Sequence, residues 1–410
     1  MDTATFINDK LAEVRMKLGA AGGISDEGAI GMITETVFDD VRSTAMSFKE
    51  LDDCIMKIFY KTRRRLGILQ PLIEDETVNE IMVNGPQNIF VERGGHVEKY
   101  GLCFDSTEEL EEIIRNVAGD VHREISELNP IVDARLADGS RVSGVYKNVA
   151  VNGPILTIRK FSDKYMKMSD LIKNGTLPVE AAMLLETLVE CGYNIFVSGG
   201  TSSGKTTLLN ALADAIPKEE RVIVIEDSAE LKLSGVENIV HMECRNSNAA
   251  GKGQITMSQL IKSSLRMRPD RIVVGEVRGG EVADMLQAMN TGHSGSMSTG
   301  HGNSVSGMLR RLESMYLMAI TLDIEAIRAQ IAEGIDIMVH IEKLEDRKRR
   351  IVEITEVAGY EKGRFRLNVL MTAKGDGQLT ATGNTLINSR KVFLKGGKNG
   401  EVLRKSGFVR

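Results

Sequence analysis

The segment with the clearest chemistry runs from 199 to 207 and reads Gly-Gly-Thr-Ser-Ser-Gly-Lys-Thr-Thr. It matches G-x-x-x-x-G-K-[ST], in which glycines let backbone N–H groups converge on phosphate oxygens. An apolar run precedes it and a helical pattern follows, as the motif requires. Lys205 would neutralise the β- and γ-phosphates, and the Thr206 hydroxyl would hold Mg²⁺. The sequence predicts a nucleoside triphosphate site formed by Gly199, Gly200, Thr201, Ser202, Ser203, Gly204, Lys205, Thr206 and Thr207.

Carboxylates follow two further apolar runs that we expect to be strands. Glu226-Asp227-Ser228-Ala229-Glu230 comes directly after 221–225, and Glu276 follows 271–274 through Gly275. Because ligands of open α/β sheets bind outside the carboxyl ends of the strands, these groups should lie beside the phosphate loop. They would serve the metal ion or the attacking water, although an ion-pair role stays open for any one residue of 226–230.

A third segment, 291–304, is rich in Gly, Ser and Thr and contains His293 and His301. Seven glycines fall within 275–302, so the backbone is expected to pass close to another group there. A histidine in such a turn, after an acidic strand end, is a candidate to sense the γ-phosphate. His301 is the stronger candidate, whereas His293 fits a structural role equally well.

The elements that must position these residues alternate between apolar strands and amphipathic helices, which predicts a layered α/β domain over 171–370. A mixed α+β module is expected before it, over 66–160, joined by a linker at 161–170. Residues 1–65 have helical periodicity and predict a small bundle. The expected strands are 80–83, 89–92, 132–136, 141–143, 155–159, 194–197, 221–225 and 271–274, and the expected helices include 107–117, 257–267 and 281–290.

Composition excludes several classes of protein. The apolar runs are far shorter than the ~20 residues that span a bilayer, and no secretory signal is visible at the N-terminus. The four cysteines form no CxxC pair and no zinc-ligand spacing, so we expect reduced thiols. No Phe, Tyr or Trp occurs between Phe196 and Tyr316, so this region offers no platform on which nucleic-acid bases could stack.

Charge is unevenly spread along the chain, whose net charge is −5. The first 60 residues carry a net −5, and the C-terminal tail, 371–410, carries +6. This distribution is not that of a uniformly basic nucleic-acid-binding protein. We expect the basic tail to be solvated, with anionic lipid or an acidic partner as alternatives.

The ordered set of motifs resembles the type II/type IV secretion and pilus ATPase superfamily. Its Walker A, aspartate-box, Walker B and histidine-box motifs match 199–206, 226–230, 271–276 and 291–304. Local sequences look most like the CpaF branch of that superfamily, and the resemblance covers about residues 66–360. These sequences are 80–86, 132–136, 157–161, 265–271, 275–281 and 285–293.

The resemblance implies a RecA-like P-loop ATPase domain preceded by a PAS-like α+β domain. It implies a homohexameric motor that hydrolyses ATP with Mg²⁺ at the cytoplasmic face of the inner membrane. Docked on integral platform proteins, such a motor powers assembly of tight-adherence (Flp-type) pili or protein secretion. No nucleic-acid partner is expected.

The resemblance also implies roles for individual residues. Glu230, with Glu226 and Asp227, would position or activate water. Glu276 and Asp227 would serve Mg²⁺ beside Thr206, and His301 would sense the γ-phosphate. Arginines of the preceding module reach the nucleotide in this family, which makes Arg135, Arg141 and Arg159 candidates.

One departure from the family pattern concerns His301, which is flanked by Gly300 and Gly302 instead of an aliphatic residue and alanine. We expect these glycines to loosen the backbone around the histidine. Two alternatives to the motor remain at this point. One is a conjugation-type nucleic-acid motor, and the other is an ATP-gated scaffold with little turnover.

Overall fold

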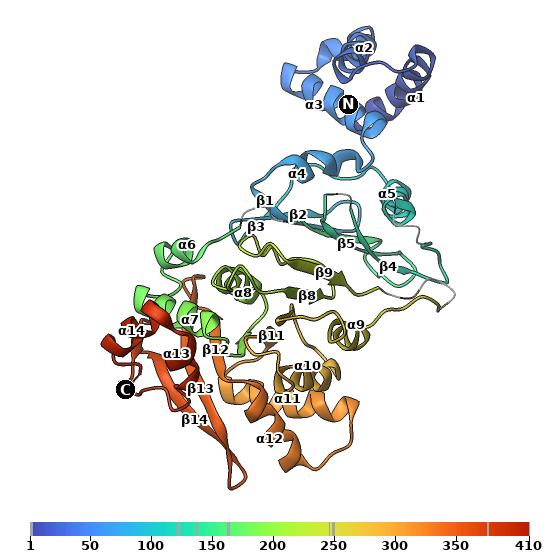
Figure 1. Ribbon diagram of the computed structural model, residues 1–410. Coiled ribbons are helices and arrows are strands. Elements are labelled where there is room, and N and C mark those ends of the chain that lie inside the picture. Colours follow the sequence, from blue (N-terminus) through green and yellow to red (C-terminus); the bar gives the residue numbers. More distant parts are fainter. Residues whose placement is uncertain are drawn as a thin grey trace. The chain divides into compact units, whose positions relative to one another are not determined.

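The computed structural model describes residues 3–409 apart from 121–123, 137, 162–164, 246, 248–250 and 375–376. The chain forms two compact units, Met1–Asp163 and Lys164–Arg410 (Figure 1). The predicted linker, 161–170, contains residues 162–164, which lie outside the described residues. Within the described part of the chain, no helix is long and apolar enough to cross a membrane.

The first unit begins with a small helical bundle. Its helices are α1 (Thr3–Ala21), α2 (Asp26–Phe38), the 3₁₀ turn η1 (Val41–Ala45) and α3 (Phe48–Arg63). Ser25 caps α2 and a Ser47–Glu50 capping box begins α3, since these side chains satisfy backbone N–H groups that the first turn leaves without partners. Apolar residues of the three helices form one core.

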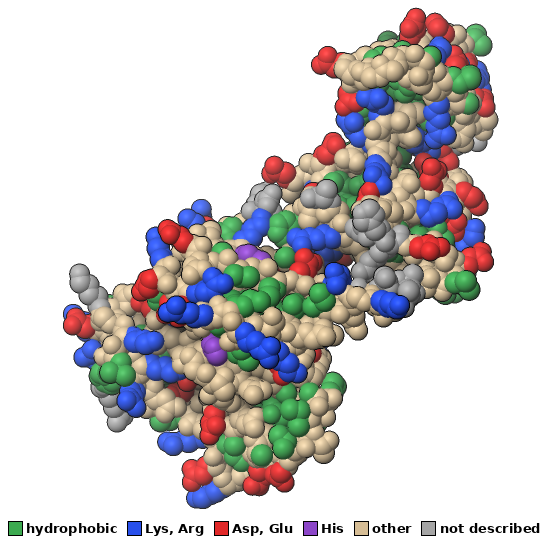
Figure 2. Space-filling view, turned by 45° about the vertical axis from the view of Figure 1, so that its right-hand side comes forward, with side chains coloured by type: hydrophobic (Ala, Val, Ile, Leu, Met, Phe, Trp, Pro, Cys, Tyr) green, Lys and Arg blue, Asp and Glu red, His purple; other side chains and the backbone are tan. Residues whose placement is uncertain are grey.

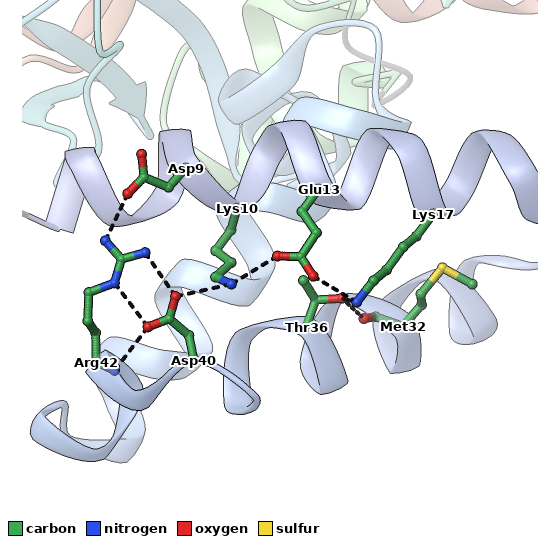
Figure 3. A network of polar contacts seen from close by, with 8 residues as sticks. All are labelled: Asp9, Lys10, Glu13, Lys17, Met32, Thr36, Asp40 and Arg42. Atoms are coloured by element: carbon green, nitrogen blue, oxygen red, sulfur yellow. Dashed lines mark hydrogen bonds and ion pairs between the residues drawn. The ribbon is translucent and has the colours of Figure 1, made fainter.

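A polar network joins the start of α1 to the η1 turn (Figure 3). Arg42 lies 2.8 Å from both Asp9 and Asp40 through its two terminal nitrogens. Lys10 contacts Asp40 at 3.1 Å and Glu13 at 2.9 Å. Hydrogen bonds from Arg42 hold the pKa of the Asp40 carboxyl well below its usual range.

The rest of the first unit is a six-stranded antiparallel sheet with the order β3-β2-β1-β6-β5-β4. Helix α5 packs on β4, and leucine, isoleucine and valine side chains from helix and strands form the core. The strands are β1 (Val78–Asn84), β2 (Ile89–Arg93), β3 (His96–Lys99), β4 (Ile131–Arg135), β5 (Arg141–Val145) and β6 (Ile155–Arg159), and the helices are η2 (Gly67–Leu69), α4 (Gln70–Glu74) and α5 (Thr107–Asp120).

The second unit is built on a nine-stranded sheet with the order β15-β14-β13-β12-β7-β11-β10-β8-β9. Strands β12 to β9 of this order run parallel, and β12 to β15 pair antiparallel. The strands are β7 (Ile195–Gly199), β8 (Val222–Glu226), β9 (Ile239–Glu243), β10 (Arg271–Val274), β11 (Met297–His301), β12 (Ile337–Lys343), β13 (Arg349–Glu361), β14 (Arg364–Ala373) and β15 (Leu379–Ala381).

Helices cover both faces of this sheet (Figure 1). Successive residues of β7 and β8 belong to two different apolar cores, as expected for strands that are buried on both sides. Helices α6 (Met168–Lys173), α7 (Val179–Glu190), α8 (Lys205–Ala213), α13 (Arg390–Lys395) and α14 (Gly397–Lys405) contribute to one core. Helices α9 (Met257–Ser264), α10 (Glu281–Asn290), α11 (Val305–Ala319) and α12 (Ile324–Gly334) contribute to the other.

The predicted α/β class is confirmed, but two expectations change. Strand β11 lies within the segment expected to be a turn, and it occupies a central position in the sheet. The basic tail is not a solvated tail in its described part, because Val392, Leu403 and Phe408 are 1–2% exposed and pack in the core of the second unit. Residues 375–376 and 410 of that tail lie outside the described residues.

Candidate active site

The phosphate loop joins the carboxyl end of β7 to the first residue of α8, Lys205. Two of its residues adopt left-handed backbone, Gly204 with φ +98° and Ser202 with φ +56°. A Cβ at Gly199 would overlap the carbonyl oxygen of Ile341, so only glycine fits there. The loop therefore leads directly into the N-terminus of α8, where backbone N–H groups and the helix dipole favour an anion.

Lys205 lies beneath this loop and is 7% exposed. Its Nζ donates hydrogen bonds to the carbonyl oxygens of Gly199, at 3.2 Å, and Gly200, at 2.8 Å. The same nitrogen lies 3.2 Å from Nδ1 of His301. A positive charge is thus held at the loop that is predicted to bind phosphate.

Strand β11 lies between β7 and β10 and brings His301 next to the loop, opposite Gly199. Nε2 of His301 is 2.6 Å from Oε1 of Glu276, the residue that follows β10. Burial lowers the pKa of His301, and the Lys205 charge acts in the same direction, whereas Glu276 opposes it. Nε2 of the ring thus faces the Glu276 carboxylate and Nδ1 faces the Lys205 ammonium, so both ring nitrogens of His301 lie against site residues.

Arg278 is a site residue that the sequence analysis missed. Its Nη2 donates to Oε2 of Glu276 at 2.9 Å, and its Nη1 lies 3.8 Å from Oδ2 of Asp227. The hydrogen bond with Glu276 raises the pKa of the Arg278 guanidinium. A cation two residues beyond an acidic strand end was the available signal, and it was weak, because arginines are common at exposed strand ends. Arg278 connects the carboxylates that follow β8 and β10.

Glu226 ends β8 and is 4% exposed. Its Oε1 accepts hydrogen bonds from the backbone N–H groups of Glu230, at 2.8 Å, and Leu231, at 3.0 Å. These contacts give Glu226 a part in shaping the loop that carries Glu230. Asp227 is different, since 61% of its side chain is exposed.

The glycines beside His301 lie in closely packed surroundings. A Cβ at Gly300 would come within 2.8 Å of Met308 Cε and 2.9 Å of Phe196 Cζ. At Gly302 it would lie 3.0 Å from Cβ and Sδ of Met308. Glycine at these two positions allows β11 to pack closely on β7 and α11, and the loosening of the backbone around His301 stays a prediction.

Of the other predicted residues, His293 belongs to the second unit and the three arginines belong to the first. Nδ1 of His293 lies 3.1 Å from the carbonyl oxygen of Ala288 at the end of α10, which is a structural contact. Arg135, Arg141 and Arg159 form one cross-strand row in the sheet of the first unit, where Arg135 pairs with Arg141 and Arg141 with Arg159. The row concentrates three arginines on neighbouring strands.

The residues present suit Mg²⁺ bound together with a nucleotide. Thr206, in the first turn of α8, and Glu276 provide hydroxyl and carboxylate oxygens, which are the ligands that this ion prefers. The described residues contain no group of three or more His, Cys, Asp or Glu side chains able to hold a metal ion. Such a site fits an ion that keeps waters and takes its other ligands from phosphates.

The fold and the site together define a P-loop ATPase. Residues 62–374 match the family described as Type II/IV secretion system protein, and the chain belongs to that family.

Two relatives and one solved structure illustrate the match. The chain is 33% identical over 299 residues to the conjugal transfer protein TrbB of Rhizobium radiobacter, covering 72% of this chain and 88% of that protein. It is 32% identical over 317 residues to the type IV secretion system protein PtlH of Bordetella pertussis, covering 70% and 93%. The pilus retraction motor PilT, solved with bound ADP, resembles the fold with a TM-score of 0.52 at 19% identity, covering 84% and 89%.

Proposed function

We propose that this chain is a CpaF-type motor that hydrolyses ATP to power assembly of a tight-adherence pilus or protein secretion. The observation that carries the proposal is the continuous contact from Lys205 through His301 to Glu276. Through these contacts, a change at the γ-phosphate position would affect both β11, which carries His301, and β10, which Glu276 follows. A motor needs such coupling, because nucleotide state has to be converted into movement.

Each site residue has a proposed part in hydrolysis. Lys205 and the loop N–H groups neutralise phosphate charge, which is most of what phosphoryl transfer requires. Mg²⁺, when bound, withdraws electron density from the phosphate oxygens, and Thr206, Glu276 and Asp227 are its proposed protein partners. Glu230 orients the attacking water from a loop that Glu226 shapes. His301 senses the γ-phosphate.

Arginines from the first unit are proposed to complete the site. Arg135, Arg141 and Arg159 lie in one row, so a single movement of their sheet would carry all three. Replacing Arg135 or Arg159 with alanine should abolish most hydrolysis and leave nucleotide binding largely intact. Unchanged turnover in both variants would remove these residues from the mechanism.

The assembly is proposed to be a homohexameric ring at the inner face of the cell membrane, docked on integral platform proteins. Support comes from relatives named for conjugal transfer and type IV secretion, processes that require membrane machinery. We further propose that 1–65, 66–160 and 171–370 act as separate domains of each subunit.

The direct test is the steady-state ATPase rate of Lys205→Ala. We expect loss of nearly all turnover, whereas Lys218→Ala, at an exposed lysine beyond α8, should match the unmodified protein. Full activity of Lys205→Ala would refute the site. Particle mass with and without a non-hydrolysable ATP analogue tests the ring, and a persistent monomer would contradict the motor.

A conjugation-type nucleic-acid motor is the second candidate, and the name of TrbB favours it. On the face shown in Figure 2, however, Lys and Arg side chains lie scattered among acidic and apolar ones. Binding of single-stranded DNA that weakens steeply with salt would support this candidate over the pilus motor.

A further inference from the structure

The β12–β13 pair lies directly behind the phosphate loop. Strand β12 pairs with β7 as far as Ile341 opposite Gly199, and Arg349 begins β13. Nε of Arg349 donates a hydrogen bond to the carbonyl oxygen of Ser202 at 2.9 Å. Cδ of the same side chain lies 3.3 Å from the position of a Cβ on Gly204. Arg349 therefore hydrogen-bonds to one left-handed residue of the loop, Ser202, and its side chain lies beside the other, Gly204.

Ser202 is the unusual residue of this loop. Its φ of +56° lies in the left-handed region, which glycine adopts freely and residues with a Cβ rarely adopt. Gly204 also has a positive φ, +98°, but as a glycine it adopts this conformation without strain. A non-glycine residue keeps such a conformation only where surrounding contacts hold it.

We propose that Arg349 is a positioning residue that holds Ser202 in the left-handed conformation. With its carbonyl fixed by the guanidinium, the peptide units around Ser202 are oriented before the nucleotide arrives. Binding then requires less ordering of the loop, which is the general advantage of a preorganised site. The inference rests on the proposed function only in taking the ligand of this loop to be a nucleotide.

The test is a double-mutant cycle in the full-length protein, read as the dissociation constant of a fluorescent ADP analogue with Mg²⁺. Arg349→Ala should weaken binding by about three- to tenfold, the loss expected for one hydrogen bond. It should leave kcat within about twofold, since binding energy alone is changed. Ser202→Gly should bind at least as tightly as the unmodified protein. In the Ser202→Gly background, Arg349→Ala should weaken binding by less than about twofold, because glycine needs no holding.

Two outcomes would overturn the proposal. If Arg349→Ala weakens binding equally in both backgrounds, its charge acts on the phosphates directly. If it weakens binding in neither, the hydrogen bond has no influence on the loop.

Arg350→Ala is the matched control. Arg350 is the next residue in the chain and pairs with Asp346 at 3.2 Å, and its removal deletes the same charge. The dissociation constant of the ADP analogue for Arg350→Ala should equal that for the unmodified protein. Thermal denaturation of every variant checks that it is folded. If the unmodified protein binds the analogue but hydrolyses no ATP, the proposed motor function is refuted. The double-mutant cycle still tests the role of Arg349 in that case, because it measures binding alone.

Discussion

Replacing Gly300 with alanine tests how closely β11 packs beneath the active site. The added Cβ would lie 2.8 Å from Met308 Cε and 2.9 and 3.1 Å from two carbons of the Phe196 ring. The end of the methionine can move, but the Phe196 ring is fully buried, so the strand itself must shift. Overpacking of this kind costs about 1–3 kcal/mol. For a unit of this size each 1 kcal/mol lowers Tm by about 2–4 °C, so we expect Tm to fall by about 2–12 °C.

Scanning calorimetry with and without nucleotide is the assay, and Gly31→Ala is the control. Gly31 lies on α2 with no heavy atom within 4 Å of an added Cβ. Alanine there should raise stability by about 0.5–1 kcal/mol, because a helix favours it over glycine. ATPase activity of Gly300→Ala should also fall, since the neighbouring His301 moves with the strand. An unchanged Tm would refute the close packing and support the prediction that the glycines loosen β11.

Three further predictions concern the charged residues of the site. Glu226→Gln should keep most ATPase turnover, because its amide oxygen still accepts from the same backbone N–H groups, and abolished turnover would make Glu226 a base. Burial lowers the pKa of His301 below the 6.5 of a free imidazole. As the pH falls through about 6.5, the unfolded state therefore binds a proton before the folded state does, and the free energy of unfolding decreases. The urea midpoint of unfolding, measured between about pH 7.5 and 5.5, should therefore fall less steeply in His301→Gln than in the unmodified protein. The same pH dependence in both proteins would show that the ring is not desolvated. Arg278→Ala should lower kcat on the order of tenfold and leave ADP affinity nearly unchanged, since it contacts Glu276 rather than the loop; weaker ADP binding would assign it to the nucleotide.

The α/β layers could be predicted because β7, β8 and β10 are continuous apolar runs between amphipathic helices. Strand β11 could not, because its sequence, Met-Ser-Thr-Gly-His, has almost no apolar side chains. It is buried nevertheless, since β7 and β10 satisfy its backbone and Thr299 donates to the carbonyl oxygen of Gly275 at 2.7 Å. The C-terminal core residues were missed because they lie far apart among glycines and lysines.

In the active site, too, some residues could be predicted from the sequence and others could not. Motif spacing and strand ends were enough to predict that Lys205, Glu276 and His301 are site candidates. The direction of the Glu226 carboxylate, toward backbone N–H groups, depends on the path of the following loop and has no signature in the sequence. Arg349 was missed for a different reason, because its contact with the loop arises from the pairing of β12 with β7, more than a hundred residues away along the chain.

The close packing around Gly300 also restricts which amino-acid substitutions evolution can accept at this position. A larger residue at 300 fits only if space opens at Met308 or Phe196, so neutral drift requires linked substitutions rather than single ones. Family members with an aliphatic residue before the histidine should therefore have smaller or differently shaped side chains at one of those two positions. Covariation among homologous sequences would reveal this pairing without any measurement on the protein.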